Sequence, residues 1–315
     1  MDKYDVVIIG GSYAGLSAAM ALGRSLRKVL IIDSGKPCNW QTPHSHNFIT
    51  HDGAEPAAIA SRARDQVLRY PGVTFLRAKA TAGVVDEGGF RIQADTGAYF
   101  AARRLLFASG VRDILPEIDG FSDCWGISVL HCPYCHGYEV RDEPTGILAN
   151  GDSAFEMVKL IGHWTRDLTL FTNGASTLSS EQRRAIESQG VGIHETAVDR
   201  IEHDGGYLTN LRLNDGSAFA LKAVYARPAF EQHCLIPQQL GCEVGDNHLL
   251  QIDAMHRTTV AGVYAAGDCV NMMRSVALAV SSGGFAGASI NKDLIEEEFH
   301  AHLQGTQPLE SNSGL

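Results

Sequence analysis

Two cysteines separated by two residues, each with a histidine beside it, form the stretch of this chain best suited to chemistry: HCPYCH, residues 131–136. A Cys-x-x-Cys pair can cycle between dithiol and disulfide. The pattern Cys-x-x-Cys-His is also the attachment signature of c-type haem, and four ligand-type side chains this close in sequence could hold zinc. The stretch alone leaves all three chemistries open, so the rest of the chain must decide between them.

The surroundings of this stretch argue against haem and zinc. The first residues, MDKYD, carry more acid than base, unlike the start of a signal peptide, and c-type haem attachment follows export. We therefore expect a cytoplasmic protein without haem. Zinc would need further ligands, because two adjacent His-Cys pairs cannot readily all surround one tetrahedral ion, and the chain has no second Cys-x-x-Cys. We expect no metal site.

Length and composition bound the class of protein. The chain has 315 residues, enough for two domains with their own cores. It is 44% hydrophobic and 20% charged, which is typical of a soluble globular protein. A net charge of −10 without a basic cluster gives no support for binding nucleic acid or an anionic membrane. Seven irregularly spaced cysteines do not indicate the disulfide framework of a small secreted domain.

A strand, a turn, a helix and a second strand are expected at the start of the chain. Residues 6–9 are consecutive apolar residues that run into glycine, which is typical of a buried parallel strand. Residues 14–26 are rich in alanine and leucine and predict a helix, and VLIID at 29–33 predicts the second strand. Together they predict one βαβ unit.

The turn of this unit carries a dinucleotide fingerprint with one departure. Gly10, Ser12 and Gly15 occupy its three glycine positions, and serine adds a small side chain where a pyrophosphate would approach the backbone. Asp33 ends the second strand, where a carboxylate binds ribose hydroxyls. The alternative interpretation is a βαβ unit that uses its glycines only for packing.

A second strand–turn–helix–strand pattern begins near residue 145, and its fingerprint is degraded. The fingerprint positions are Ala149, Gly151 and Ala154, so the first glycine is missing. The following strand ends in the TNG of residues 172–174, with neither the acid that would bind an NAD ribose nor the arginine that would meet the extra phosphate of NADP. A Rossmann-like domain that no longer binds a nucleotide well is therefore an open alternative.

Five segments of the chain carry a family resemblance. They are VVIIGGSYAG at 6–15, FASG at 107–110, CPYC at 132–135, ILANGDSAFE at 147–156 and GVYAAGD at 262–268. In this order and spacing they resemble the low-molecular-weight thioredoxin reductase family of flavoproteins, over about residues 4–298. The resemblance implies an α/β fold with two Rossmann-like, three-layer ββα nucleotide-binding domains, the second inserted into the first.

The resemblance also implies the domain boundaries and the cofactor. An FAD-binding domain would cover 1–114 and 236–315, and an inserted NAD(P)-binding-like domain carrying the CPYC would cover 115–235. The long helix that begins near Val276 would direct its N-terminal dipole at the pyrimidine side of the flavin and stabilise its reduced, anionic form. The other residues implied to bind FAD are Gly10, Ser12, Ala14, Gly15 and Asp33 for the ADP half, Gly267 and Asp268 for the ribityl and pyrophosphate region, and Asn47 along the flavin.

Within the CPYC, the resemblance separates the roles of the two cysteines. Cys135 would face the flavin and exchange electrons with it, and Cys132 would form the mixed disulfide with the substrate. In the family an aspartate follows the second cysteine and serves as acid and base. Here His136 takes that position and His131 precedes the pair. Because imidazole titrates near neutrality, we expect at least one of them to transfer a thiol proton.

The resemblance leaves the direction of electron flow open. A reductase would take electrons from NADPH or NADH and pass them to a thioredoxin-like protein or a small-molecule disulfide, as a homodimer. The form HCPYCHGYE and the TNG without arginine resemble a branch with dithiol oxidases that close disulfides in gliotoxin- and holomycin-type natural products, using oxygen. Other members of the wider family take electrons from ferredoxin. A flavin-bound redox sensor without turnover, or a flavoenzyme without thiol chemistry, remain as alternatives.

Overall fold

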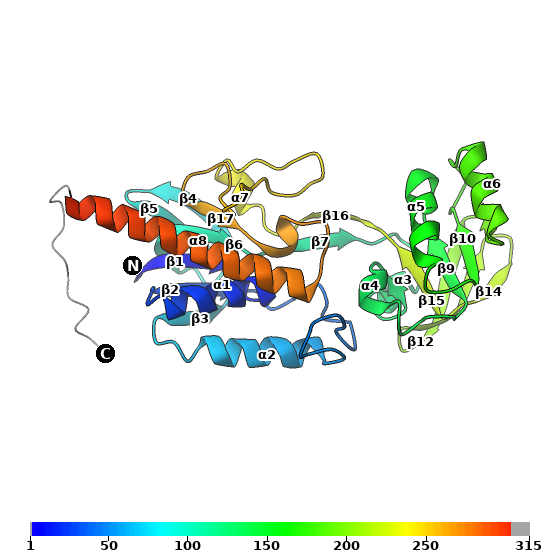
Figure 1. The fold of residues 1–315 in the computed structure, drawn as a ribbon, viewed down its shortest axis with the longest axis horizontal. Coiled ribbons are helices and arrows are strands. Elements are labelled where there is room, and N and C mark those ends of the chain that lie inside the picture. Colours follow the sequence, from blue (N-terminus) through cyan, green and yellow to red (C-terminus); the bar gives the residue numbers. More distant parts are fainter. Residues whose placement is uncertain (1, 304–315) are drawn as a thin grey trace. The chain divides into compact units, whose positions relative to one another are not determined.

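The computed structural model of this chain describes residues 2–303 and divides into two units (Figure 1). Within the described residues, unit 1 comprises 2–37, 58–112 and 232–303, and unit 2 comprises 38–57 and 113–231. The division differs from the boundaries expected from the sequence chiefly at 38–57, which were placed with the first domain. This segment packs within unit 2, where the Gln41 side chain donates a hydrogen bond to the carbonyl of Ser122 at 3.1 Å.

Unit 1 is built on a seven-stranded sheet with the order β3-β2-β1-β6-β5-β4, in which β17 also pairs with β6. Its strands are β1 (Asp2–Ile9), β2 (Val29–Asp33), β3 (Val73–Arg77), β4 (Ala80–Asp86), β5 (Gly89–Ala94), β6 (Tyr99–Phe107) and β17 (Val263–Ala265). β1, β2, β3, β6 and β17 pair in parallel, and β4 and β5 join as an antiparallel edge. The expected βαβ unit at the start of the chain is confirmed.

Helices and a short turn complete unit 1. They are α1 (Tyr13–Arg24), α2 (Pro56–Val67), α7 (Ile236–Gln239), the 3-10 helix η1 (Gly267–Cys269) and α8 (Val276–Leu303). α8 lies along α1 (Figure 1), and two of its glycines allow the close approach. A Cβ on Gly283 would lie 2.0 Å from the carbonyl oxygen of Ala14, and one on Gly287 would lie 2.7 Å from that of Ala18.

The core of unit 1 lies on both faces of its sheet. Val7, Ile9 and their neighbours on β2 belong to one buried apolar cluster, whereas Val6 and Ile8 belong to another that includes α1 and α8. Successive side chains of a strand point to opposite faces. The unbroken apolar run at residues 6–9 is therefore explained by burial of both faces, as in other parallel sheets.

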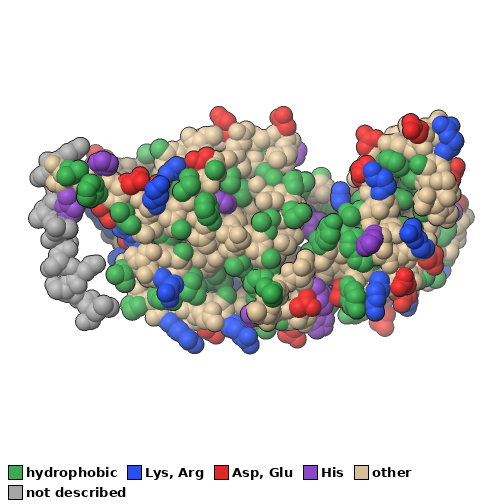
Figure 2. All heavy atoms as spheres, in the orientation of Figure 1, with side chains coloured by type: hydrophobic (Ala, Val, Ile, Leu, Met, Phe, Trp, Pro, Cys, Tyr) green, Lys and Arg blue, Asp and Glu red, His purple; other side chains and the backbone are tan. Residues whose placement is uncertain are grey.

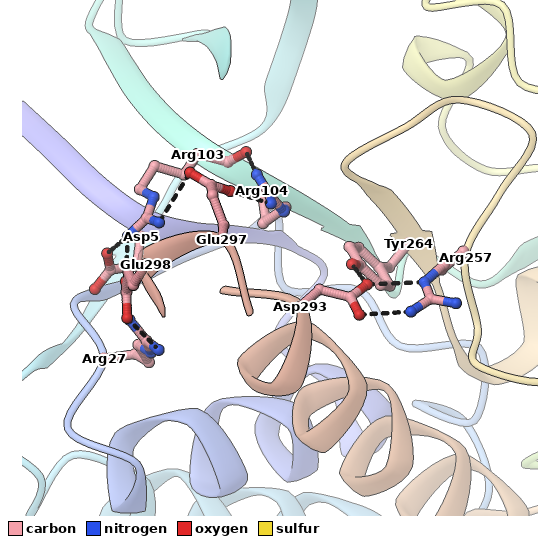
Figure 3. Close-up of polar contacts among 9 residues, drawn as sticks. All are labelled: Asp5, Arg27, Arg103, Arg104, Arg257, Tyr264, Asp293, Glu297 and Glu298. Atoms are coloured by element: carbon pink, nitrogen blue, oxygen red, sulfur yellow. Dashed lines mark hydrogen bonds and ion pairs between the residues drawn. The ribbon is translucent and has the colours of Figure 1, made fainter. Parts of the chain in front are cut away.

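Ion pairs connect the second half of α8 to the rest of unit 1 (Figure 3). Glu298 accepts hydrogen bonds from Arg27 at 2.5 Å and from Arg103 at 2.6 Å. Five residues earlier on α8, Asp293 accepts a hydrogen bond from Nε of Arg257 at 2.8 Å. These contacts join the end of the described chain to the α1–β2 connection, to β6 and to the loop before β17.

Unit 2 contains a parallel five-stranded sheet in the order β11-β10-β9-β15-β8 and a three-stranded antiparallel sheet β12-β13-β14. The strands are β8 (Val129–Leu130), β9 (Thr145–Leu148), β10 (Leu168–Phe171), β11 (Gly192–His194), β12 (Val198–Asp204), β13 (Tyr207–Leu213), β14 (Ala218–Ala220) and β15 (Ala223–Ala226). The helices are α3 (Phe121–Cys124), α4 (Pro133–His136), α5 (Gly151–Ile161) and α6 (Ser180–Ser188). The strand–turn–helix–strand expected from residue 145 is thus confirmed.

The remaining strands, β7 (Val111–Ile114) and β16 (Ala229–Gln232), form a separate two-stranded sheet, and the division between the units falls within each of them. Within residues 2–303, no helix is both long enough and apolar enough to cross a membrane. On the face drawn in Figure 2, lysine and arginine side chains are scattered among acidic ones.

Candidate active site and cofactor-binding site

The two cysteines of the CPYC lie on one short helical turn of unit 2. Cys132 is the N-cap of α4, which follows β8, and proline occupies the first turn. Residues three apart on a helix share a face, so the turn brings the two thiols together. The Cys135 thiol donates a hydrogen bond to Sγ of Cys132 at 2.8 Å, and the Cys135 amide donates to the Cys132 carbonyl at 3.2 Å.

This hydrogen bond makes Cys132 more acidic than an ordinary thiol. The donor from Cys135 lowers the pKa of Cys132 to about 7. Burial opposes the shift, while backbone amides and the charge of Arg227 assist it. The thiolate is the form that attacks disulfides, and near neutral pH a large share of Cys132 is in this form. The geometry supplies a nucleophile at Cys132 and a proton at Cys135.

The flanking histidines differ from the sequence expectation in one respect. Burial lowers the pKa of His136 to about 4, with a further contribution from the nearby His46. His136 is therefore neutral at physiological pH and does not titrate near neutrality as an isolated imidazole would. It can accept a proton, but only weakly. The His131 ring lies at the other end of the pair, with its centroid 6.5 Å from that of Trp125.

Tyr225 is a residue of this site that the sequence did not reveal. It is 1% exposed on β15, and its hydroxyl has no hydrogen-bond partner among residues 2–303. Burial raises its pKa, and the neighbouring Cys132, Glu139 and Cys135 raise it further. Its segment, AVYA, is an ordinary buried strand. Only the pairing of β15 with β8, which aligns Tyr225 with Leu130, brings the phenol to the cysteines.

A pocket of about 340 Å³ opens within unit 2 beside the CPYC. We call it the aromatic–acidic pocket; its lining residues are His46, Asn47, Asp52, Pro133, Tyr134, Tyr138, Glu139 and Trp164. Asn47, expected along a flavin, belongs to unit 2, whereas the other residues expected to bind FAD belong to unit 1. Its amide donates to Oδ1 of Asp52 at 2.8 Å. The sequence did not single out the aromatic members of this pocket.

In unit 1, the turn between β1 and α1 has the close packing that a dinucleotide cradle needs. Gly10 has φ of 108°, which favours glycine, and a Cβ there would lie 2.2 Å from the carbonyl oxygen of Ala108. A Cβ on Gly15 would lie 1.9 Å from the carbonyl oxygen of Gly10. Ser12 is the N-cap of α1 and makes no side-chain capping bond. Oδ1 of Asp33 accepts a hydrogen bond from the Gly11 amide at 3.0 Å.

The expected ribityl and pyrophosphate residues lie next to this turn. Gly267 begins η1, donates its amide to the Ser282 hydroxyl of α8 at 2.9 Å, and would bring a Cβ within 2.9 Å of the Cβ of Ala14. Asp268 follows it, and α8 begins at Val276 as expected. The buried Ser109 hydroxyl, beside Gly10, has no hydrogen-bond partner among the described residues. This unpartnered polar group beside the β1–α1 turn fits a bound dinucleotide such as FAD.

The corresponding turn of unit 2 is closed by its own side chains. Oδ1 of Asn150 caps α5 by accepting from the Gly151 amide at 2.8 Å, and it also accepts from the Thr177 amide at 2.8 Å. A Cβ on Gly151 would lie 2.7 Å from the Thr177 hydroxyl oxygen. Donors that would meet a pyrophosphate are thus partly satisfied inside the chain. Oδ1 of Asn173, at the end of β10, accepts from the Val198 amide.

Within residues 2–303, no three His, Cys, Asp or Glu side chains gather in a way that could hold a metal ion. His131, Cys132, Cys135 and His136 therefore do not form a metal cluster in this structure.

Comparison with known proteins identifies similar chains across nearly the full length. The pattern of the family described as "Pyridine nucleotide-disulphide oxidoreductase" matches residues 4–283. The chain is 31% identical to thioredoxin reductase tcpT of Claviceps purpurea, covering 93% of this chain and 95% of the relative. An oxidoreductase from Agrobacterium tumefaciens is 36% identical, with a TM-score of 0.88 over 93% of this chain and 99% of its own. The crystal structure of HlmI is 32% identical, with a TM-score of 0.90 over 96% of each chain.

Proposed function

Since this chain belongs to the pyridine nucleotide-disulphide oxidoreductase family and is a thioredoxin reductase-like flavoprotein, we propose that it passes two electrons between FAD and the Cys132–Cys135 pair, and on to or from a thiol substrate. The observation that carries this proposal is the contact of the two thiols, with a hydrogen bond from Cys135 that lowers the pKa of Cys132 to about 7. A buried structural pair would gain nothing from an acidic thiol.

For the cofactor, we propose the unit 1 residues that the structure brings to one place. Gly10, Ser12, Ala14 and Gly15 would hold the ADP half at the start of α1, and Asp33 would bind its ribose. Gly267, Asp268 and the first turn of α8 at Val276 would hold the remainder. Bound FAD supplies the two-electron acceptor and donor for the thiol pair. We propose Asn47 as a further residue that binds FAD.

For the thiol chemistry, we propose that Cys132 forms the mixed disulfide with the substrate and Cys135 exchanges electrons with the flavin. The Cys135 proton, already directed at Cys132, leaves when Cys135 attacks the mixed disulfide. Neutral His136 would accept a thiol proton transiently, and His131 would assist at the other end of the pair. The buried Tyr225 hydroxyl would donate a hydrogen bond to a sulfur that carries negative charge.

A second candidate function is dithiol oxidation, with oxygen as the final acceptor. The closed turn at the start of α5 favours it, because Oδ1 of Asn150 already accepts from the Gly151 amide, a backbone donor that a nicotinamide dinucleotide would use. A ferredoxin-dependent reductase would fit the same closed turn. On the family resemblance alone, we also propose a cytoplasmic homodimer that acts on a thioredoxin-like protein or on a small-molecule dithiol or disulfide.

The deciding experiment is an anaerobic titration of the purified flavoprotein with NADPH, NADH and dithiothreitol separately, following the flavin absorbance. We expect the dithiol to bleach the flavin and the nicotinamides to do so slowly, with peroxide formed when air is admitted. Rapid bleaching by a nicotinamide would instead establish a reductase with a working second site. Failure of every donor, including dithiol, would contradict flavin–thiol electron exchange.

Cysteine variants test the separate roles proposed for Cys132 and Cys135. Cys135→Ser should abolish bleaching by dithiol. Cys132→Ser should leave a Cys135 thiolate beside the flavin, visible as a long-wavelength charge-transfer band. The matched control is Cys38→Ser, which removes an exposed cysteine outside the pair and should behave as wild type. Full dithiol turnover in Cys135→Ser would indicate a flavoenzyme without this thiol chemistry.

A further inference from the structure

Three aromatic rings surround part of the aromatic–acidic pocket. The rings of Tyr134 and Trp164 meet edge to face, with centroids 5.5 Å apart and planes at 89°. Tyr138 adds a third ring, and its face already carries the guanidinium of Arg141 at 4.0 Å from the centroid. Tyr134 is 58% exposed and Tyr138 is 67% exposed. Perpendicular aromatic faces are the usual wall of a site for an ammonium group, because the negative ring faces attract a cation.

Two carboxylates stand at another side of the same pocket. Nδ1 of His46 lies 3.6 Å from Oδ1 of Asp52 and 3.5 Å from Oε1 of Glu139, so both carboxylates converge on one imidazole. Among the described lining residues there is no lysine or arginine. Two cations lie close to its surroundings: Arg141 is held on the ring of Tyr138, and the charge of Arg227 acts on Cys132. The pocket itself therefore combines aromatic faces with a surplus of acid.

The position of this pocket links it to the thiol chemistry. Pro133 and Tyr134, which line it, are the two residues between Cys132 and Cys135. Its volume of about 340 Å³ suits a small molecule rather than a folded protein. We propose that the aromatic–acidic pocket selects small-molecule disulfides, or the corresponding dithiols, that carry a protonated amine near the sulfur. This inference rests on the proposed disulfide chemistry and adds its substrate class.

The reaction on such a substrate balances without an external donor for one turnover. The Cys132 thiolate attacks one sulfur of the disulfide, and the first thiol leaves, taking up a proton. Cys135 then loses its proton and attacks Sγ of Cys132, and the second thiol leaves with that proton. The enzyme dithiol is oxidised to the disulfide, and one substrate disulfide is reduced to two thiols. The ammonium group of the substrate stays in the pocket through the first attack.

Three disulfides of different charge test the inference. Holoprotein is reduced with dithiothreitol, desalted under anaerobic conditions and mixed with cystamine, bis(2-hydroxyethyl) disulfide or dithiodiglycolate, which have similar length and positive, neutral or negative ends. The first thiol released is followed in time. Because the three disulfides differ in intrinsic reactivity, each rate is divided by the rate of the same disulfide with free mercaptoethanol. We expect the corrected rate of cystamine to exceed that of the neutral disulfide about tenfold, and the excess to shrink in 0.5 M salt.

Substitutions of pocket residues test whether the pocket is the source of the preference for cystamine. Glu139→Gln and Trp164→Leu should each lower the ratio of cystamine to neutral disulfide several-fold. Glu143→Gln removes one acid from an exposed position of unit 2 outside the pocket and should keep the ratio of the wild type. Equal corrected rates for all three disulfides in the wild type, or a preference that survives both pocket variants, would overturn the inference while leaving the thiol chemistry intact.

A non-reactive ligand separates this inference from the proposed function. 1,6-Diaminohexane has the length and charge of cystamine without sulfur, and 1,6-hexanediol is its neutral match. Calorimetry with the wild-type holoprotein should show binding of the diamine at least tenfold tighter than that of the diol. If no disulfide releases thiol, the proposed function fails. If the diamine binds no better than the diol, the pocket inference fails, whatever the outcome with disulfides.

Discussion

The reactivity of Cys132 depends on a hydrogen bond that only its partner cysteine donates. An ordinary thiol has a pKa near 9.0, and at Cys132 the contact with Cys135 brings the pKa to about 7 against the effect of burial. His136 does not share this role, because burial keeps it neutral. The acidity of Cys132 is therefore set chiefly by the thiol of Cys135, and His136 remains a weak proton acceptor.

The sign of this shift predicts a pH profile. Cys132 loses its proton at lower pH than an ordinary thiol, so its alkylation by iodoacetamide in the reduced protein should rise with a midpoint near pH 7. Cys135→Ala removes the donor, and the midpoint should move toward 9.0. At pH 7 the rate should fall about fivefold to tenfold, since greater intrinsic nucleophilicity partly offsets the smaller thiolate fraction.

Peptide mass spectrometry measures this profile at Cys132 alone, with the exposed Cys38 as an internal control in both proteins. An unchanged midpoint in Cys135→Ala would show that Cys135 is not the source of the shift.

At the scale of elements, the contact of α1 and α8 positions both ends of the proposed cofactor site. α1 begins at the fingerprint turn, and α8 begins at Val276, next to η1. The two helices can approach because Gly283 presents no side chain to the Ala14 carbonyl. The packing of the two helices thus requires glycine at position 283, and this packing places the N-termini of both helices.

Neighbouring glycines of α8 provide a matched pair of substitutions. Gly283→Ala places a Cβ 2.0 Å from backbone, which cannot move cheaply, and should lower the free energy of unfolding of unit 1 by about 1–3 kcal/mol and weaken FAD retention. Gly284→Ala meets only the Ser17 hydroxyl, at 3.1 Å, and gains about 1 kcal/mol of helix propensity. Urea unfolding and the flavin-to-protein absorbance ratio measure both effects. Equal behaviour of the two variants would contradict the packing account.

At the scale of the whole molecule, the ion pairs of α8 join segments that are far apart in sequence. Burial alone would raise the pKa of Glu298, but hydrogen bonds from Arg27 and Arg103 outweigh it and hold the pKa below the usual 4.5. A carboxyl whose pKa is lowered on folding stabilises the fold above its unfolded pKa. That contribution is lost as the pH falls below about 4.5 and through the folded pKa.

Glu298→Gln should therefore lower Tm at pH 7 and have much less effect at pH 3. Discounted for partial exposure, the loss is about 1 kcal/mol, or roughly 2–4 °C. The matched control is Glu296→Gln on the same helix, which forms a largely exposed ion pair with Lys292 at 3.7 Å and should change Tm by less than about 1 °C. Calorimetry at the two pH values would contradict this account if the effect of Glu298→Gln did not depend on pH.

The amino-acid sequence alone was enough to predict the α/β class, the two strand–turn–helix–strand patterns and the family. These follow from local order: an apolar run that is buried on both faces of a sheet, glycines where Gly10 and Gly15 meet backbone, and a Cys-x-x-Cys whose spacing is one helical turn. Each feature is encoded within a few neighbouring residues. The resemblance then needed only the order of five such segments along the chain.

Which distant residues meet the cysteines could be seen only in the folded chain. Tyr225 reaches the pair because β15 pairs with β8, and the segment 38–57 brings His46 and Asp52 to Glu139. The pKa of His136 likewise depends on burial in the folded chain and on His46, which is far from it in sequence. Strand pairing and desolvation depend on contacts across long sequence separations, which leave no periodic or spaced signal in the sequence. They shift protonation and shape a pocket only when the chain is folded.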